Sequence, residues 1–112
     1  PSWGEGFGLT PLQAIASGMP TITVPAWAPY KRFLDPNLGI GSSLAKSTWP
    51  DLHPGYMLRP NFDDVIDRLR YAFDNYDESA AGALRTAPAV HEEYDWDYLT
   101  NQSFKALESR LK

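Results

Sequence analysis

The stretch that decides the fold covers residues 5–20 and reads EGFGLTPLQAIASGMP. A glycine-rich turn leads into a short helix predicted over Pro11–Ser17, and Gly18 ends that helix. Proline is well suited to the first turn of a helix, and Thr10 can cap this turn. Gln13 stands at the third helical position, where it would complete a capping box with Thr10.

The start of this helix is suited to binding an anion. The first N–H groups of a helix have no partner within it, and they carry a partial positive charge. Gly6 and Gly8 allow a ligand to approach the backbone closely, while Glu5 and Gln13 can form hydrogen bonds with sugar hydroxyls. The alternative is a solvated tight turn in which Gln13 only caps the helix.

The residues that follow predict an α/β fold. Thr21–Val24 is β-branched throughout, which predicts a strand. A turn, a helix and a strand in this order favour a parallel sheet. We therefore expect a partial Rossmann-like domain with a short parallel sheet and C-terminal helices, occupying residues 1–112 as one domain.

Three helices are expected in the C-terminal half. Asn61–Asn75 is amphipathic and has Asn61 as its cap, and Asp77–Tyr94 is richer in alanine. A last helix is expected over Trp96–Leu111, with Asp95 as its cap. Two shorter elements are predicted before them, a helical turn at Tyr30–Leu34 and a brief strand at Tyr56–Leu58.

The composition excludes several classes of function. The net charge is −4 and no basic run occurs, so nucleic-acid binding has no electrostatic basis. The chain has no cysteine, and His53 and His91 are isolated, so no metal site is expected. No apolar stretch approaches the ~20 residues of a membrane span, and a cytoplasmic location is expected.

Segment 5–20 resembles the E-x7-E region of the family-4-type retaining glycosyltransferases, which have the two-Rossmann-domain (GT-B) architecture. Their pattern reads E-G-F-G-L-x-P-L-E-A-x-A-x-G-x-P, and a strand follows it. Tyr94-Asp95-Trp96 resembles the F/Y-x-W start of their terminal helix. The resemblance implies a C-terminal, nucleotide-sugar-binding part of an enzyme that transfers a hexose with retention. The N-terminal acceptor domain and a basic pair for the diphosphate would precede Pro1, so this chain alone would be inactive.

The resemblance also assigns a donor site. It places Glu5 against the transferred sugar as the catalytic group. Gln13 replaces the glutamate that holds the ribose hydroxyls, and an amide accepts fewer hydrogen bonds and carries no charge. The backbone groups that approach the sugar come from Gly6, Phe7 and Gly8, and those that approach the diphosphate come from Leu9 and Thr10. The nucleotide sugar is the substrate, and no metal or other cofactor is implied.

Other readings of the same residues remain open. A degenerate, non-catalytic module that binds a sugar or a partner protein is favoured by Gln13 and by the short chain. A different α/β nucleotide-binding protein is a third possibility. Lys31 and Arg32 could contact a phosphate, although two cations beside a proline turn are more often solvated. The strand predicted over Thr21–Val24 would have an unpaired edge, through which the chain could associate with itself.

Overall fold

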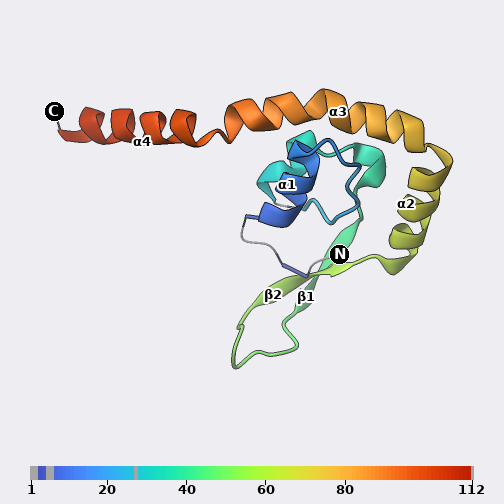
Figure 1. The fold of residues 1–112 in the computed structure, drawn as a ribbon. Coiled ribbons are helices and arrows are strands. Elements are labelled where there is room, and N and C mark those ends of the chain that lie inside the picture. Colours follow the sequence, from blue (N-terminus) through green and yellow to red (C-terminus); the bar gives the residue numbers. More distant parts are fainter. Residues whose placement is uncertain (1–2, 5–6, 27, 112) are drawn as a thin grey trace.

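The computed structural model describes residues 3–4, 7–26 and 28–111. The described residues before position 61 form a small body, and the helices that follow extend along its outside (Figure 1). Within these residues the chain forms four α-helices, two short 3-10 helices and one two-stranded sheet. In chain order the elements are α1 (Leu9–Ala16), η1 (Pro29–Phe33), η2 (Pro36–Leu38), β1 (Ser42–Lys46), β2 (Tyr56–Pro60), α2 (Phe62–Asp74), α3 (Tyr76–Glu93) and α4 (Trp96–Leu111).

The sheet contradicts the predicted Rossmann-like fold with a short parallel sheet. Strands β1 and β2 form an antiparallel pair in which Leu44 lies opposite Leu58. The residues of the predicted strand Thr21–Val24 are all described, and they make only one isolated parallel bridge, between Thr23 and Gly39. Pro25 follows at once and cannot donate a ladder hydrogen bond, so the pairing stops there.

The β-branched residues that predicted a strand serve the core instead. Thr23 and Val24 are both buried by this chain, so the free strand edge expected for self-association is not present in Thr21–Val24. One core cluster joins α1 to η1 and α3, and its buried members are Leu12, Ile15, Ala28, Tyr30, Leu34 and Val90. The second cluster consists of Val24, Ile40 and Leu58, with Val65 of α2 packed against it. Burying one such large apolar side chain contributes about 1.5–3 kcal/mol.

The three C-terminal helices confirm the sequence prediction, and so do two of their caps. The N–H of Asp63 donates to the side chain of Asn61 at 3.1 Å, which caps α2. The N–H of Tyr98 donates to the side chain of Asp95 at 2.8 Å at the start of α4. The short elements near Tyr30 and Tyr56 are also present, as η1 and β2.

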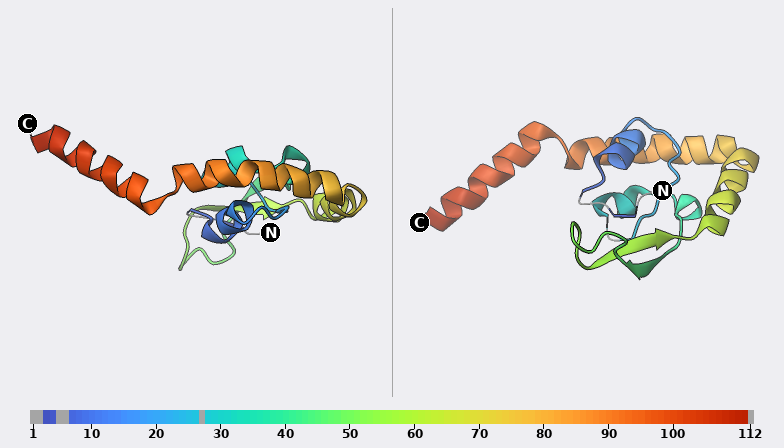
Figure 2. Two further views of the ribbon diagram at one scale, coloured as in Figure 1. Left: turned by 45° about the horizontal axis from the view of Figure 1, so that its top comes forward. Right: turned by 90° about the horizontal axis from the view of Figure 1, so that it is seen from below.

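The helices differ in how closely they pack on the body. Helix α3 lies along α1 and supplies the buried Val90 to the first core cluster. Helix α4 extends away from the body, and none of its residues is buried (Figure 2). Among the described residues, no helix combines the length and the apolar character that crossing a membrane requires.

Candidate functional site

Helix α1 begins two residues earlier than the sequence predicts, and Gly8 is its N-cap. Gly8 has φ 77° and ψ 50°, a left-handed conformation that glycine adopts without the steric cost of a side chain. Thr10 lies inside the helix, and no side chain caps its start. The predicted capping box of Thr10 and Gln13 is therefore wrong, because the glycine turn itself sets the direction of the helix.

The structure confirms the prediction that Gly18 ends helix α1. Gly18 has φ 71°, and its N–H donates to the carbonyl of Ile15 at 2.9 Å. The N–H of Met19 donates to the carbonyl of Ala14 at 3.0 Å, which completes a Schellman-type turn. The whole helix is therefore held between two left-handed glycines.

The aromatic ring of Tyr30 holds the start of α1 in place. Tyr30 is fully buried, and a β-carbon at position 8 would lie 2.8 Å from its Cδ1 and closer still to its Cε1. The Tyr30 hydroxyl donates to the carbonyl of Val24 at 3.0 Å and lies 3.2 Å from the Thr23 hydroxyl. The turn at Gly8 therefore rests on a ring that is itself fixed by two hydrogen bonds.

Two backbone donors at the start of α1 have no partner within the part of the chain that the structure describes. The first helical hydrogen bond runs from the N–H of Leu12 to the carbonyl of Gly8, at 3.1 Å. The N–H groups of Leu9 and Thr10 precede this bond and have no acceptor among the described residues. Both residues are exposed, so an anion from solvent can reach this end of the helix.

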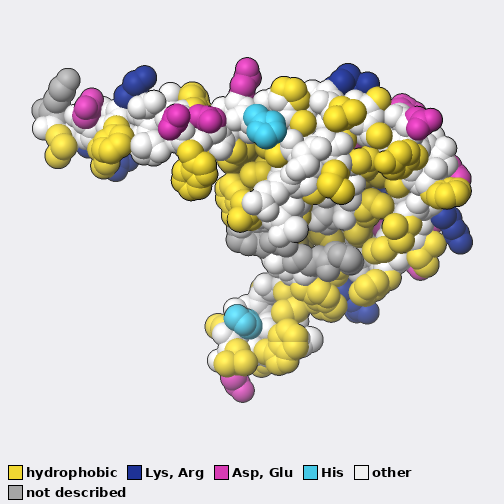
Figure 3. Space-filling model, viewed as in Figure 1, with side chains coloured by type: hydrophobic (Ala, Val, Ile, Leu, Met, Phe, Trp, Pro, Cys, Tyr) yellow, Lys and Arg dark blue, Asp and Glu magenta, His cyan; other side chains and the backbone are white. Residues whose placement is uncertain are grey.

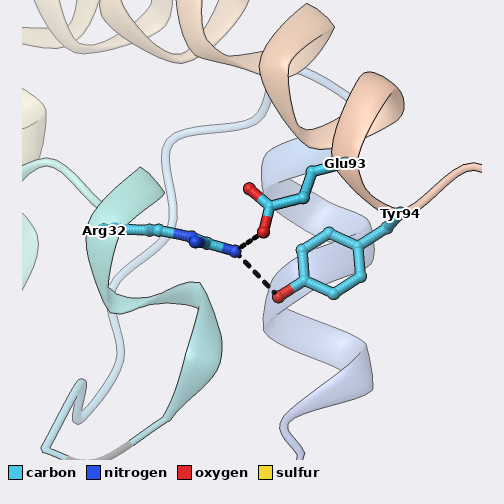
Figure 4. A network of polar contacts seen from close by, with 3 residues as sticks. All are labelled: Arg32, Glu93 and Tyr94. Carbon is cyan, nitrogen blue, oxygen red and sulfur yellow. Dashed lines mark hydrogen bonds and ion pairs between the residues drawn. The ribbon is translucent and has the colours of Figure 1, made fainter. Parts of the chain in front are cut away.

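The end of α3 holds the other side of the turn. The ring of Phe7 meets the ring of Tyr94 edge to face, with centroids 5.7 Å apart, and Phe33 meets the same tyrosine at 6.2 Å. Arg32 donates to the carboxylate of Glu93 and, at 3.4 Å, to the Tyr94 hydroxyl (Figure 4). Residues far apart in the sequence are thus brought together beside the glycine turn.

This Arg32 contact has no local sequence signal, because Glu93 lies 61 residues further along the chain. The guanidinium also lies 4.8 Å from the centre of the Phe33 ring, a cation–π contact. The carboxylate of Glu93 thus neutralises the charge of Arg32, one of the two cations that the sequence suggests as phosphate contacts. No ion pair involving Lys31 occurs within the described part of the chain.

The side chain of Gln13 is exposed and makes no hydrogen bond to any residue that the structure describes. Its backbone carbonyl accepts hydrogen bonds from the N–H and the hydroxyl of Ser17, at 3.0 and 2.9 Å. Gln13 follows Leu9 by four residues, so the two share one face of α1. The predicted site residues Glu5 and Gly6 lie outside the described residues.

A separate cavity of about 360 Å³ lies near the other end of α1, between that helix, η2 and α3. The buried Ser79 hydroxyl beside it has no hydrogen-bond partner among the residues that the structure describes, and this cavity is not part of the turn at Gly8. No group of three histidine, aspartate or glutamate residues in the described ranges could hold a metal ion.

Comparisons with family models, with curated proteins and with solved structures found no match. The functional assignment therefore depends on the sequence of residues 5–20 and on the geometry around Gly8. The start of α1 offers a left-handed glycine and two amides without an acceptor among the described residues, and the exposed Gln13 lies one turn further along the helix.

Proposed function

We propose that residues 5–20 form part of the donor site of a retaining glycosyltransferase, which transfers a hexose from a nucleotide sugar to an acceptor. One observation carries the proposal: directly after the left-handed Gly8, the amides of the exposed residues Leu9 and Thr10 have no acceptor among the described residues. These are the two positions at which the resemblance to the E-x7-E region implies contact with the diphosphate.

The chemistry of the reaction requires such donors. When the bond between the sugar and the diphosphate breaks, negative charge develops on the leaving phosphate oxygen. Fixed N–H groups stabilise that charge, because they need no reorganisation during the reaction. The dipole of α1 adds about 0.3–1 kcal/mol for an anion at its exposed start. In this proposal Glu5 accepts hydrogen bonds from the hydroxyls of the transferred hexose.

The exposed carboxamide of Gln13 supports a contact with the nucleotide ribose. An amide has both a carbonyl acceptor and an NH2 donor, so it can pair with two neighbouring hydroxyls. With the capping box absent, no hydrogen bond within the described residues competes for this side chain. The missing charge makes the contact weaker than one made by glutamate.

The packing around the turn supports preorganised binding. Tyr30 fills the space beside Gly8, and Tyr94 holds the ring of Phe7. A donor site of this kind gains rate by positioning its groups before the substrate arrives. A cytoplasmic location belongs to the same proposal, and the absence of cysteine is compatible with a reducing compartment.

The experiment that tests the proposal compares Gln13→Glu with Gln102→Glu. Both glutamines are exposed on helices, and both variants add one negative charge, but Gln102 lies on α4, outside residues 5–20. Donor affinity is measured by calorimetry with a panel of uridine, guanosine and adenosine diphosphate hexoses. We expect Gln13→Glu to increase the affinity for the preferred donor, and Gln102→Glu to leave it unchanged.

Glu5→Ala tests the sugar contact. In the complete protein, with its N-terminal domain and the acceptor present, the loss of this carboxylate should lower kcat/KM by about 100-fold, the loss typical of one positioned polar group. Unchanged activity, together with equal donor affinities for Gln13→Glu and Gln102→Glu, would remove both residues from the site.

A non-catalytic module that binds a sugar or a partner protein is the second candidate. The observation that favours it is Gln13 itself, which stands where the related enzymes have an acid. Saturable donor binding without turnover by the complete protein, in the presence of acceptor, would distinguish this candidate from the enzyme.

A further inference from the structure

Helix α2 has an apolar stripe that the chain itself leaves uncovered. Phe62, Ile66, Leu69 and Phe73 are 56%, 49%, 57% and 85% exposed, and we call these four residues the α2 stripe. Hydrophobic side chains are visible over this side of the molecule, at the right of Figure 3. No residue of α2 is buried, although its amphipathic pattern is the strongest of any helix in the described chain.

The orientation of the α2 stripe is fixed by contacts on another face of the helix. Val65 packs against the second core cluster, and Arg68 donates through Nε to the carbonyl of Gly39 at 3.1 Å. The carboxylate of Asp64 accepts the N–H of Gly41 at 2.8 Å. These contacts hold α2 on the body and leave the stripe facing outward.

The spacing of the α2 stripe is that of a helix-pairing seam. Its members follow one another at intervals of four, three and four residues, the alternation that places side chains along one contact line between two helices. From either end, the α2 stripe has phenylalanine at its outer positions and an aliphatic residue at its two central positions. An antiparallel copy of α2 therefore places Phe62 opposite Phe73 and Ile66 opposite Leu69, so the stripe is complementary to itself.

The charges beside the seam favour the same arrangement. Asp63 and Arg70 lie seven residues apart on one flank of the stripe, two turns from each other. In an antiparallel pair this flank faces its own copy, which brings Asp63 of each chain toward Arg70 of the other. Within the described residues, Arg70 has only a 3.9 Å pairing with Asp67 on the same exposed surface, so its guanidinium is available.

We infer that the α2 stripe is a self-association surface, on which α2 of a second copy of this chain packs antiparallel about a two-fold axis. Such an interface uses the same patch on both copies. The contact is independent of the donor site at Gly8. It also differs in place from the strand edge that the sequence suggested, since Thr23 and Val24 are buried.

The charge pattern favours self-pairing of the α2 stripe but disfavours self-pairing of α4, the other helix with an exposed apolar face. On α4, antiparallel self-pairing along its apolar face, which includes Trp96 and Leu107, brings Asp97 toward Glu108 of the other copy, a repulsive contact. A membrane surface is also a poor occupant of the α2 stripe. The helix carries the acidic residues Asp63, Asp67 and Asp74 along the outward flank, and these repel anionic lipids.

The expected affinity is modest. Four side chains on a 13-residue helix provide less than the ~800 Å² per partner that a standard interface buries. We therefore expect a reversible monomer–dimer equilibrium with a dissociation constant of about 10 µM to 1 mM.

Sedimentation velocity over a concentration series tests the inference. The wild-type chain should shift reversibly from monomer toward dimer as its concentration rises. Ile66→Glu combined with Leu69→Glu should abolish that shift, since it places charges at the centre of the seam. The matched control is Phe104→Glu, which adds a charge at an exposed apolar position of α4 and should leave the equilibrium unchanged. A wild-type monomer at about 1 mM, or a dimer that Phe104→Glu dissociates, would overturn the inference.

A charge exchange tests the antiparallel register. Asp63→Arg alone and Arg70→Asp alone should each raise the dissociation constant by about tenfold, because each replaces two attractive pairs by repulsive ones. The double variant Asp63→Arg with Arg70→Asp should restore the wild-type value. Circular dichroism checks that all three variants retain their helices. If the double variant associates as weakly as the single ones, this register is wrong.

Discussion

The buried ring of Tyr30 occupies the space that a side chain at position 8 would require. Gly8 has a positive φ of 77°, and a β-carbon there would stand 2.8 Å from Cδ1 of the ring and closer to Cε1. The residue that begins α1 is therefore constrained twice, by its own backbone conformation and by a fixed aromatic neighbour. The amides of Leu9 and Thr10 follow directly, so the packing of Tyr30 determines where these donors lie.

Gly8→Ala should lower the free energy of unfolding by about 2–4 kcal/mol, because left-handed strain and a steric clash both contribute. Urea denaturation followed by circular dichroism measures the loss. Two controls separate the causes. Gly55 has φ 113° and open space around it, so Gly55→Ala carries only the strain. Gly4→Ala meets nothing within 4 Å and should be nearly neutral. A loss for Gly8→Ala no larger than that for Gly55→Ala would contradict the role of Tyr30.

Tyr30→Phe should lower the free energy of unfolding by about 1–3 kcal/mol. The variant keeps the ring but removes the hydroxyl, so the buried carbonyl of Val24 and the Thr23 hydroxyl lose a partner. Chemical denaturation at constant pH measures this loss. Tyr56→Phe is the matched control, since Tyr56 is exposed on β2 and should tolerate the change. Equal stabilities of the two variants would show that the Tyr30 hydroxyl contributes nothing.

Glu93→Gln should have a small effect on stability, below about 1 kcal/mol, even though it removes the ion pair with Arg32. The two side chains are 40% and 54% exposed, so solvent and salt screen their attraction. The difference from wild type should shrink further at high ionic strength. Thermal unfolding at low and high salt measures both effects, with Glu108→Gln on α4 as the control. A loss of several kcal/mol that persists in high salt would mean that the pair is far better shielded than its exposure indicates.

The helices could be predicted because their signals are local. Asn61 and Asp95 stand directly before the helices that they cap, and the apolar periodicity of α2 is visible within thirteen residues. The strand predicted over Thr21–Val24 is wrong, because β-branched residues alone do not determine that a segment pairs. Those side chains favour burial as much as pairing, and Pro25 prevents the ladder from continuing.

The candidate site could be predicted only in part. The glycine turn and the helix after it are encoded in consecutive residues, so residues 5–20 revealed them. The ring of Tyr30 against Gly8 and the contact between Arg32 and Glu93 join residues that lie far apart in the sequence. No periodicity or cap signals such contacts, because they arise from tertiary packing.

The most direct measurement is a titration of the isotopically labelled chain with nucleotide hexoses, followed by the amide resonances of Leu9 and Thr10. We expect one donor to shift both resonances in a saturable way, its nucleoside diphosphate to reproduce most of that shift, and the free hexose to leave both unmoved. The resonances of α4 should stay in place throughout. If no donor moves the Leu9 and Thr10 amides at about 5 mM, or if the shifts occur elsewhere in the chain, the start of α1 is not a diphosphate site.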